Sequence, residues 1–573
     1  MNQLVPVFEQ RGESTELIVL LHAYKHTRQN LASLRNVASE TKPDADILTP
    51  DLPTTVFSFA SPDAIVASLL EIVDQKWRDR ADTGDPYQRI TIVGHSLGAL
   101  IGRKLYVCAC GENENAPLGP LFAQKRPRPW ASAVDRVILL AGMNNGWEID
   151  HHLSGLSAAI WTIGVVVGNF LRLVRKGEPI IFTIRRGAVF LTELRLQWLS
   201  MRRNAKDKGA GDALTIQLLG SVDDMVSPRD NLDLITGRDF VYLDVPHSGH
   251  ANVIEMDDAT HGTERATIFK KTLVASPDDL RTLQVLPADN PAGEPDESVG
   301  EVVFVIHGIR DEGYWTHKIA RTIQNLGKQA DRKIATETSS YGYFPILQFL
   351  LPGERRQKVQ WFMNQYVEVA AQYPNATLSF VGHSHGTYLL AKSLQEYGCC
   401  NFNRVVFAGS VVRTKYDWDR FLRSGQVKAV ANYVATADWV VAFFPKTIQM
   451  LGIQDLGSAG HDGFASPSVS QIEYVRGSHG AAIQEANWTA IADFIINGGE
   501  ATTPTDLRSD QRSPIVLLPG YIAPFVWVLI ALVVFCGGWL IYFVANSLGL
   551  AEWQTTLLYV SYFYGIWRFL MKY

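Results

Sequence analysis

The sequence predicts an α/β protein with two mostly parallel sheets, followed by a C-terminal membrane segment. Short apolar runs alternate with helical patterns through both halves of the 573 residues, a pattern typical of α/β folds with a parallel sheet. The stretches "TIVGHSLGALIG" (91–102) and "SFVGHSHGTYLL" (379–390) repeat one arrangement in the two halves. A charge-free stretch near the end contains a long apolar run.

The strand candidates form two series of similar order. Each candidate is a short apolar run bounded by polar or turn-forming residues, as expected of strands buried in a sheet. The first series is "LIVLL" (17–21), "DILTP" (46–50), "ITIVG" (90–94), "RVILLAG" (136–142), "LTIQLLG" (214–220) and "FVYLDV" (240–245). The second series is "VVFVI" (302–306), "TLSFVG" (377–382), "RVVFAG" (404–409), "VANYVA" (430–435) and "QIEYV" (471–475).

Two polar segments divide the chain, which is longer than one ordinary domain. The segment 276–300 is rich in Pro, Asp, Glu and Gly, a composition typical of a linker. The segment 498–513 is a second polar linker. We therefore predict one α/β domain at 1–275, another at 301–497, and a membrane anchor at 514–573.

Composition excludes several classes of function. Hydrophobic residues make up 47% and charged residues 19% of the chain, which excludes a disordered protein. The net charge is −5 and no cluster of Lys and Arg is interleaved with aromatic residues, so we expect no nucleic-acid partner. Five cysteines without a disulfide framework, and an N-terminus without an export-signal pattern, predict reduced cytoplasmic domains.

The C-terminal segment predicts a transmembrane helix. No charged residue occurs from Ser513 to Ala551, and "FVWVLIALVVFCGGWLIYFV" (525–544) is long enough to cross the hydrocarbon core of a bilayer. A further apolar run at 553–567 either returns across the membrane or lies in its interface, where Trp and Tyr are enriched. Both alternatives stay open from the sequence.

The charges that flank the two apolar runs favour a hairpin. Arg508 and Arg512 precede the first run, Arg568 and Lys572 follow the second, and the loop at 546–552 contains neither Lys nor Arg. Positive residues concentrate on the cytoplasmic side of membrane segments. We therefore expect the α/β domains to face the cytoplasm, with a hairpin through which copies of the chain could form a homo-oligomer.

Each serine-centred stretch fits a nucleophile elbow. The pattern Gly-x-Ser-x-Gly alone is weak, because it arises by chance about 0.2 times in a chain of this length. Both copies, however, have a strand pattern before the serine and a helical pattern after it, which the elbow requires so that a strained turn exposes the hydroxyl. Ser96 and Ser384 are therefore the candidate nucleophiles.

With these motifs the chain resembles the α/β-hydrolase superfamily, in particular lipase-like and esterase-like serine hydrolases, in two tandem copies. In that superfamily a His-Gly pair ends an early strand, and the next residue and the residue after the nucleophile donate backbone N–H groups to the oxyanion hole. The resemblance implies Ile309 and His385 for the second copy. It implies Tyr24 and Leu97 for the first, where Ala23 replaces the usual glycine.

A serine hydroxyl needs a histidine to accept its proton and a carboxylate to orient that histidine. In this superfamily the triad follows the order Ser, Asp, His along the chain. The stretch "LLGSVDDMVSP" resembles the superfamily's loop after the penultimate strand, where a Val follows the acid at three residues. The resemblance implies Asp223, with Asp224 as the alternate. In "VYLDVPHSGHANVIE" the resemblance to the usual Pro-x-x-Gly-His loop selects His250 over His247.

The second copy contains the same ordered set. "NYVATADWVV" places Asp438 three residues before Val441, and "EYVRGSHGAAI" supplies His479. The upstream spacings also agree, since positions 22 and 96 are 74 residues apart and positions 307 and 384 are 77 residues apart. Two chance matches would not agree so closely, so we predict a duplicated catalytic domain.

The two halves differ in the segment between serine and acid. Positions 96 and 223 are 127 residues apart, whereas positions 384 and 438 are 54 apart. The excess, at about 145–205, lies where this superfamily carries lid insertions. It contains the charge-free run 153–171, followed by "RLVRK". We favour an apolar lid that covers the pocket or dips into the membrane over a buried helix or a transmembrane span.

The sequence therefore predicts a membrane-anchored serine hydrolase of carboxylic esters, with lipids or phospholipids as the favoured substrates and the membrane as partner. The mechanism requires no cofactor and no metal, and His151 and His152 lack further ligands at a recognisable metal-binding spacing. Other readings stay open. They are a thioesterase or peptidase on the same fold, and a binding or scaffold protein in which one or both domains are inactive.

Overall fold

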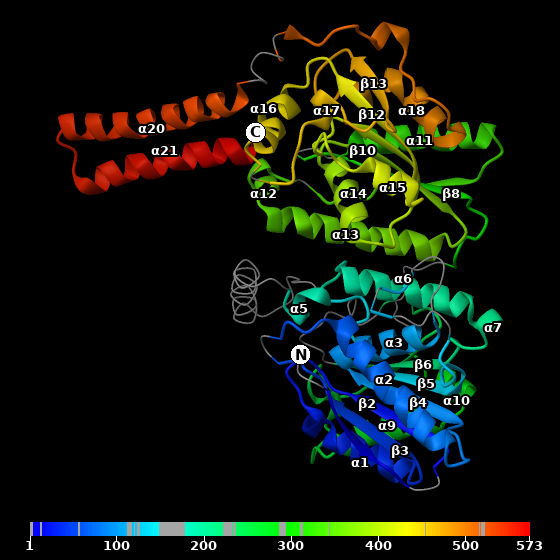
Figure 1. Ribbon diagram of the computed structural model, residues 1–573. Helices are drawn as coiled ribbons and strands as arrows, with labels where there is room; N and C mark the ends of the chain where they lie inside the picture. Colours follow the sequence, from blue (N-terminus) through cyan, green and yellow to red (C-terminus); the bar gives the residue numbers. More distant parts are fainter. Residues whose placement is uncertain are drawn as a thin grey trace. The chain divides into compact units, whose positions relative to one another are not determined.

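The computed structural model of the chain (Figure 1) contains two compact units. Unit 1 comprises Met1–Glu294 and Met363–Gln372, and unit 2 comprises Pro295–Phe362 and Tyr373–Tyr573. The residues that the structure describes are 4–11, 14–55, 58–111, 117–119, 121–122, 127–147, 178–221, 233, 237–285, 294–309, 313–342, 344–452, 454–514, 516 and 522–572.

The sheet of unit 1 has the strand order β1-β3-β2-β4-β5-β6-β7. Strand β1 pairs antiparallel with β3, and every other pair is parallel. The strands are β1 (Val5–Glu9), β2 (Glu16–Leu21), β3 (Asp46–Asp51), β4 (Arg89–His95), β5 (Val134–Leu140), β6 (Leu214–Gly220) and β7 (Val241–Val245).

Helices cover both faces of this sheet. Alternation along β2 divides the core, because Leu17, Val19 and Leu21 pack with α2, α3 and α6, whereas Ile18 and Leu20 pack with α1 and α9. The described α-helices of unit 1 are α1 (Ala32–Thr41), α2 (Pro62–Ala81), α3 (Leu97–Ala109), α5 (Ile180–Thr183), α6 (Val189–Arg203), α7 (Ala205–Lys208), α9 (Gly262–Val274) and α10 (Pro277–Thr282).

The sheet of unit 2 is parallel throughout, with the order β13-β12-β11-β10-β8-β9. Its order from β8 to β13 matches that of unit 1 from β2 to β7, strand for strand. The strands are β8 (Glu301–Ile306), β9 (Ile334–Glu337), β10 (Thr377–His383), β11 (Phe402–Ala408), β12 (Val427–Ala435) and β13 (Ser470–Val475).

The two faces of the second sheet have different cores. Aliphatic side chains from the strands pack with α11 and α18 on one face. On the other face Phe402 makes edge-to-face contacts with Phe304 and Phe380, and both of these rings make edge-to-face contacts with Phe362 of α13, on which Phe402 stacks. The helices are α11 (Tyr314–Gln329), α12 (Ile346–Leu350), α13 (Pro352–Gln372), α14 (His385–Glu396), α15 (Trp418–Arg423), α16 (Trp439–Leu451), α17 (Ala459–Asp462) and α18 (Glu485–Asn497).

All eleven strand candidates from the sequence lie in strands of the structure. Two strands, β1 and β9, were not predicted from the sequence. Both lie at the edge of a sheet and none of their residues is buried. Edge strands of this kind lack the apolar run on which a prediction of strands depends.

The two predicted linkers contain more structure than their composition suggests. The segment 276–300 includes α10, which Ser276 caps by accepting a hydrogen bond from the Asp279 N–H at 3.2 Å. The segment 498–513 packs along β13, where the Arg476 N–H donates to the Leu507 carbonyl at 2.7 Å. This second segment is therefore part of the body of unit 2.

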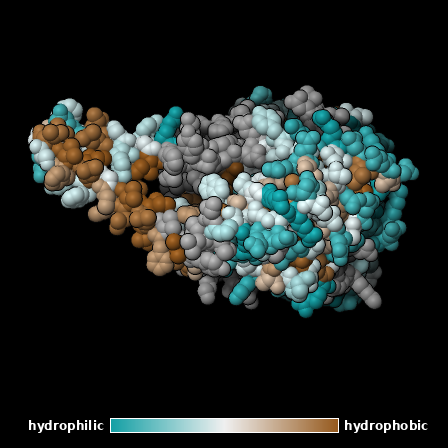
Figure 2. All heavy atoms as spheres, turned by 90° about the horizontal axis from the view of Figure 1, so that it is seen from above, coloured by the Kyte–Doolittle hydropathy of each residue, from teal (hydrophilic) through white to brown (hydrophobic). Residues whose placement is uncertain are grey.

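The C-terminal residues form a helical hairpin of α20 (Ala523–Ser547) and α21 (Glu552–Lys572). The Tyr559 and Tyr562 hydroxyls of α21 donate to the Gly538 and Val534 carbonyls of α20, at 3.1 and 2.9 Å. Among the described residues, one helix, Trp527–Ser547, is long and apolar enough to cross a membrane. The large apolar side chains of both hairpin helices are mostly exposed and form the brown projection in Figure 2.

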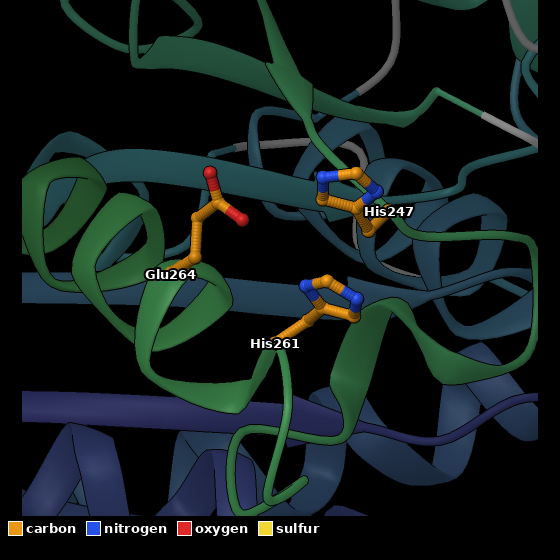
Figure 3. Close-up of side chains that lie close together, drawn as sticks. All are labelled: His247, His261 and Glu264. Carbon is orange, nitrogen blue, oxygen red and sulfur yellow. The ribbon is translucent and has the colours of Figure 1, made fainter.

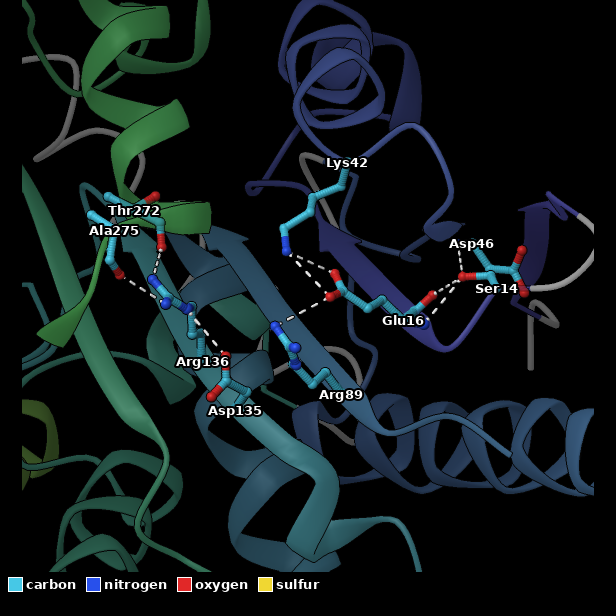
Figure 4. A network of polar contacts seen from close by, with 9 residues as sticks. All are labelled: Ser14, Glu16, Lys42, Asp46, Arg89, Asp135, Arg136, Thr272 and Ala275. Atoms are coloured by element: carbon cyan, nitrogen blue, oxygen red, sulfur yellow. Dashed lines mark hydrogen bonds and ion pairs between the residues drawn. The ribbon is translucent and has the colours of Figure 1, made fainter. Parts of the chain in front are cut away.

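A network of polar contacts lies at the amino-terminal ends of the parallel strands of the first sheet (Figure 4). Glu16, at the start of β2, pairs with Lys42 at 3.0 Å and with Arg89 at 3.3 Å. Arg136 of β5 donates to the carbonyls of Thr272 and Ala275, at 2.7 and 2.9 Å, and so holds the C-terminal end of α9. Cations at helix C-termini satisfy carbonyls that lack an intrahelical partner.

Arg136 should contribute more to stability than Arg89, although both lie in this network. The Arg136 side chain is 11% exposed and makes two hydrogen bonds to carbonyls at the end of α9 besides its contact with Asp135, so Arg136→Ala should lower the free energy of unfolding by about 2 kcal/mol. The Arg89 side chain is 59% exposed, and its removal should cost less than about 0.5 kcal/mol. Urea denaturation of the full chain measures both values. Equal shifts in the two variants would contradict the assignment.

Candidate active sites

Ser96 and Ser384 occupy the same strained turn between a strand and a helix. Their φ and ψ angles are 53° and −114° for Ser96, and 52° and −118° for Ser384. Positive φ is rare for residues other than glycine and stores strain where a side chain must be presented. Each serine N–H donates to the end of the next strand, at Leu140 O (2.9 Å) and Ala408 O (3.0 Å). Both serines have the geometry that the elbow motif predicts.

Close backbone packing explains why the second residue after each serine is glycine. A Cβ atom on Gly386 would lie 2.6 Å from the carbonyl oxygen of Ile306, at the end of β8. A Cβ atom on Gly98 would overlap the carbonyl oxygen of Leu21, at the end of β2. The elbow helix can therefore approach the neighbouring strand only where this position is glycine, and that approach brings together the two segments that contain the predicted oxyanion donors.

In unit 1 the serine contacts the predicted histidine. The Nε2 atom of His250 lies 2.8 Å from the Oγ atom of Ser96, and both side chains are buried. This is the distance at which histidine accepts a serine proton. His247 lies in the same loop but stacks on His261. The predicted acid Asp223 and its alternate Asp224 lie outside the described residues.

In unit 2 the histidine contacts the predicted acid. The Nδ1 atom of His479 lies 3.0 and 2.9 Å from the two carboxylate oxygens of Asp438, which is fully buried. Within the described part of unit 2, Ser384 Oγ makes no hydrogen bond to His479. Hydrogen bonds of catalytic groups are often long in structures without substrate and shorten when it binds.

The spacing from Asp438 to Val441 has a structural cause. Asp438 is the N-cap of α16, and its Oδ1 accepts a hydrogen bond from the Val441 N–H at 3.0 Å. One carboxylate therefore caps a helix and orients His479.

The histidine before each serine holds the loop that carries the predicted catalytic histidine. The His95 Nε2–H donates to the carbonyl of His250 at 2.8 Å, and the His383 Nε2–H donates to the carbonyl of His479 at 3.3 Å. Our sequence reasoning assigned these two residues no role. The signal was present, because both copies read Gly-His-Ser rather than Gly-x-Ser.

A second pair of histidines shapes the predicted oxyanion loops. In unit 1, His22 Nδ1–H donates to Ala23 O at 2.9 Å while its Nε2 accepts from the Leu52 N–H at 2.8 Å. In unit 2, His307 makes the same bond to Gly308 O at 2.8 Å, and its Nε2 lies 2.7 Å from the Ser340 hydroxyl. These bonds hold the loops that contain Tyr24 and Ile309, the predicted donors.

The other two predicted donors are the first residues of the elbow helices. Leu97 begins α3 and His385 begins α14, so their N–H groups lack an acceptor within the helix. Gly308 approaches Ser384 so closely that a Cβ atom there would lie 2.8 Å from the serine Cβ. Unit 1 has Ala23 at this position, buried to 4% exposure, so its loop accommodates a methyl group that the loop of unit 2 would not.

Burial keeps several histidines near the serines neutral. Desolvation lowers the pKa of His22, which matches a ring that both donates and accepts. Desolvation also holds the pKa of His385 well below its usual value, and the nearby charges of Arg355 and Lys358 add to this effect. Neutral rings at these positions add no positive charge that would disfavour protonation of the predicted catalytic histidine.

Comparisons with known proteins give distant likenesses. No family model matches the chain, and no curated protein matches it. Similar solved structures include a lipase-esterase related protein from Clostridium acetobutylicum (12% identity, 47% of this chain and 99% of that chain, TM-score 0.28). A second is an α/β hydrolase enzyme from a sediment metagenome of the Mar Chica lagoon, Morocco (18% identity, 45% of this chain and 91% of that chain, TM-score 0.25). A third is esterase B from Lactobacillus rhamnosis (11% identity, 48% of this chain and 78% of that chain, TM-score 0.30). At such low identities and TM-scores, we base the function on the geometry of the site.

The close approach at Gly386 gives a direct test of the elbow. Gly386→Ala should lower the free energy of unfolding by about 1–3 kcal/mol, because backbone oxygens cannot yield to the new methyl group. Gly398→Ala is the matched control, since no atom lies within 4 Å of a Cβ atom there. Thermal unfolding of the full chain measures both. Equal stability of the two variants would contradict the proposed packing constraint.

Proposed function

We propose that the protein is a serine hydrolase that cleaves carboxylic esters, built from two tandem α/β-hydrolase domains. The observation that carries this proposal is the 2.8 Å contact between His250 Nε2 and Ser96 Oγ at a serine with φ of 53°. The equal strand orders of the two sheets and the paired elbows support the duplication.

The proposed reaction in unit 1 follows from the positions of its groups. Ser96 Oγ attacks the ester carbonyl carbon while its proton moves to His250 Nε2, and the C=O electrons form an oxyanion. The N–H groups of Tyr24 and Leu97 stabilise this oxyanion, with about 2.7–4 kcal/mol for each such donor in comparable sites. The alcohol then leaves with the proton from His250, and water hydrolyses the acyl-enzyme by the same steps.

The two units support different parts of the triad proposal. In unit 1 the serine and histidine are in contact, and Asp223 is the proposed acid. In unit 2 the histidine and acid are in contact, and Ser384 is the proposed nucleophile with Ile309 and His385 as oxyanion donors. The missing Ser384–His479 hydrogen bond, among the described residues, favours a second candidate in which unit 2 binds ligands without turnover.

The contacts of the hairpin support a lipid substrate for unit 2. Helix α16, which begins directly after Asp438, packs against α20, with the rings of Phe444 and Trp527 5.5 Å apart. The side chain of Trp439, next to Asp438, is 61% exposed. If α20 spans the bilayer with unit 2 in the cytoplasm, the second site lies at the membrane surface, where Trp is enriched.

Labelling with a fluorophosphonate probe tests the nucleophiles. Wild-type protein should be labelled, and Ser96→Ala should remove most of the labelling because only Ser96 contacts its histidine. Ser384→Ala should remove the remainder if unit 2 is active. Failure of both serines to react in folded protein would contradict the hydrolase proposal.

A second experiment distinguishes the substrate classes. It compares the rate of fatty-acid release from phospholipid vesicles with the rates of hydrolysis of a short-chain ester, a thioester and a peptide.

Charged substitutions in α20 test the membrane anchor. Leu532→Arg with Val533→Arg should weaken membrane insertion, because an arginine near the centre of a span costs about 2.5–3.5 kcal/mol. Val274→Arg with Leu283→Arg is the matched control, since these exposed apolar residues of unit 1 lie outside the hairpin. Alkaline carbonate extraction of membranes measures retention. Equal retention of both double variants would contradict anchoring by α20.

A further inference from the structure

Two histidines and a glutamate converge on one face of unit 1, outside the proposed catalytic groups (Figure 3). They are His247, from the loop between β7 and His250, and His261 and Glu264, at the start of α9. Their ligand atoms all lie within 4.8 Å of one another. The two imidazole rings stack at 4.2 Å with an interplanar angle of 21°, and the Glu264 carboxylate points toward them.

Hydrogen bonds fix the two backbone segments that carry these three side chains. His247 has a φ of 52°, a strained conformation that no step of the proposed ester hydrolysis requires. The buried Arg265 of α9 fixes the loop, because it donates to the His247 carbonyl at 2.8 Å and to Ser248 Oγ at 2.8 Å. Asp258 accepts from the His261 N–H at 2.7 Å and so fixes the start of the helix.

The donor set and the local charge suit a divalent transition metal. Imidazole nitrogens with one carboxylate oxygen are ligands for Zn²⁺, in sites that keep a fourth position for water. Tetrahedral Zn²⁺ bonds of about 2.0–2.1 Å place donors about 3.3 Å apart. The in-plane lone pairs of two stacked rings do not meet at one point, so the exposed side chains of His247 and Glu264 must rotate out of the stacked arrangement when the ion binds. The carboxylates of Asp258 and Glu264 outweigh the charge of Arg265 and oppose the positive end of α9.

We propose that His247, His261 and Glu264 bind one Zn²⁺ ion that clamps the catalytic-histidine loop to α9. The ion would join the loop after β7 to the start of α9, 14 residues further along the chain, and His247 lies only three residues before His250. Because the bound ion stabilises the arrangement that binds it, metal should raise the stability of this loop. The site is distinct from Ser96 and does not depend on ester hydrolysis by this protein.

Titration of the full chain in detergent, after treatment with a chelator, tests the site. Wild-type protein should bind one Zn²⁺ per chain in isothermal titration calorimetry, and Co²⁺ should give the visible absorption bands of a tetrahedral site. Glu264→Gln and His247→Asn should each weaken Zn²⁺ binding at least about tenfold. Asparagine tolerates positive φ, so the second variant removes the imidazole without adding backbone strain.

The matched control is His317→Ala, which removes an exposed histidine from unit 2 and should leave Zn²⁺ binding unchanged. Zn²⁺ should also raise the unfolding temperature of the wild type and of His317→Ala, but not of the two site variants, whose folding circular dichroism verifies. No saturable Zn²⁺ binding by the wild type would overturn the proposal. Unchanged binding by the Glu264→Gln, His247→Asn double variant would overturn it too.

Discussion

The close approach of each elbow helix to the end of the adjacent strand is the constraint on which both candidate sites depend. Gly98 and Gly386 leave space only for a hydrogen against the carbonyls of Leu21 and Ile306. The approach lets a single residue, the serine, make the turn at positive φ, and a hydrogen bond from its N–H to the next strand offsets part of the strain. The proposed oxyanion hole of each unit depends on this close approach of helix and strand.

Four histidines outside the proposed catalytic groups position the site through hydrogen bonds. His95 and His383 hold the carbonyls of the proposed catalytic histidines, while His22 and His307 hold the loops of the proposed oxyanion donors. The repetition of these bonds in both units suggests that the loops need external support. Such loops follow the strands at the carboxyl edge of a parallel sheet and have no ladder bonds of their own.

Much of the fold could be predicted from the sequence because parallel strands buried on both faces form continuous apolar runs. The edge strands β1 and β9 escaped prediction because their residues are half exposed or exposed. Of the site, the serines were predictable from Gly-x-Ser-x-Gly between a strand and a helix. The predicted acid Asp438 came from the resemblance to the acid loop of the superfamily, and the structure adds a cause for its spacing, because its carboxylate caps α16 by accepting from the Val441 N–H.

The sequence by itself therefore determined the two series of strands, the two elbows and the order of serine, acid and histidine, because each depends on local periodicity or short spacing. Only the tertiary structure decided that His250, which the resemblance had selected over His247, comes within reach of Ser96, across 154 residues of chain. It also decided that His247 meets His261 and Glu264 instead. Both contacts depend on how the loops pack on the sheet and on α9, and no short pattern encodes that packing.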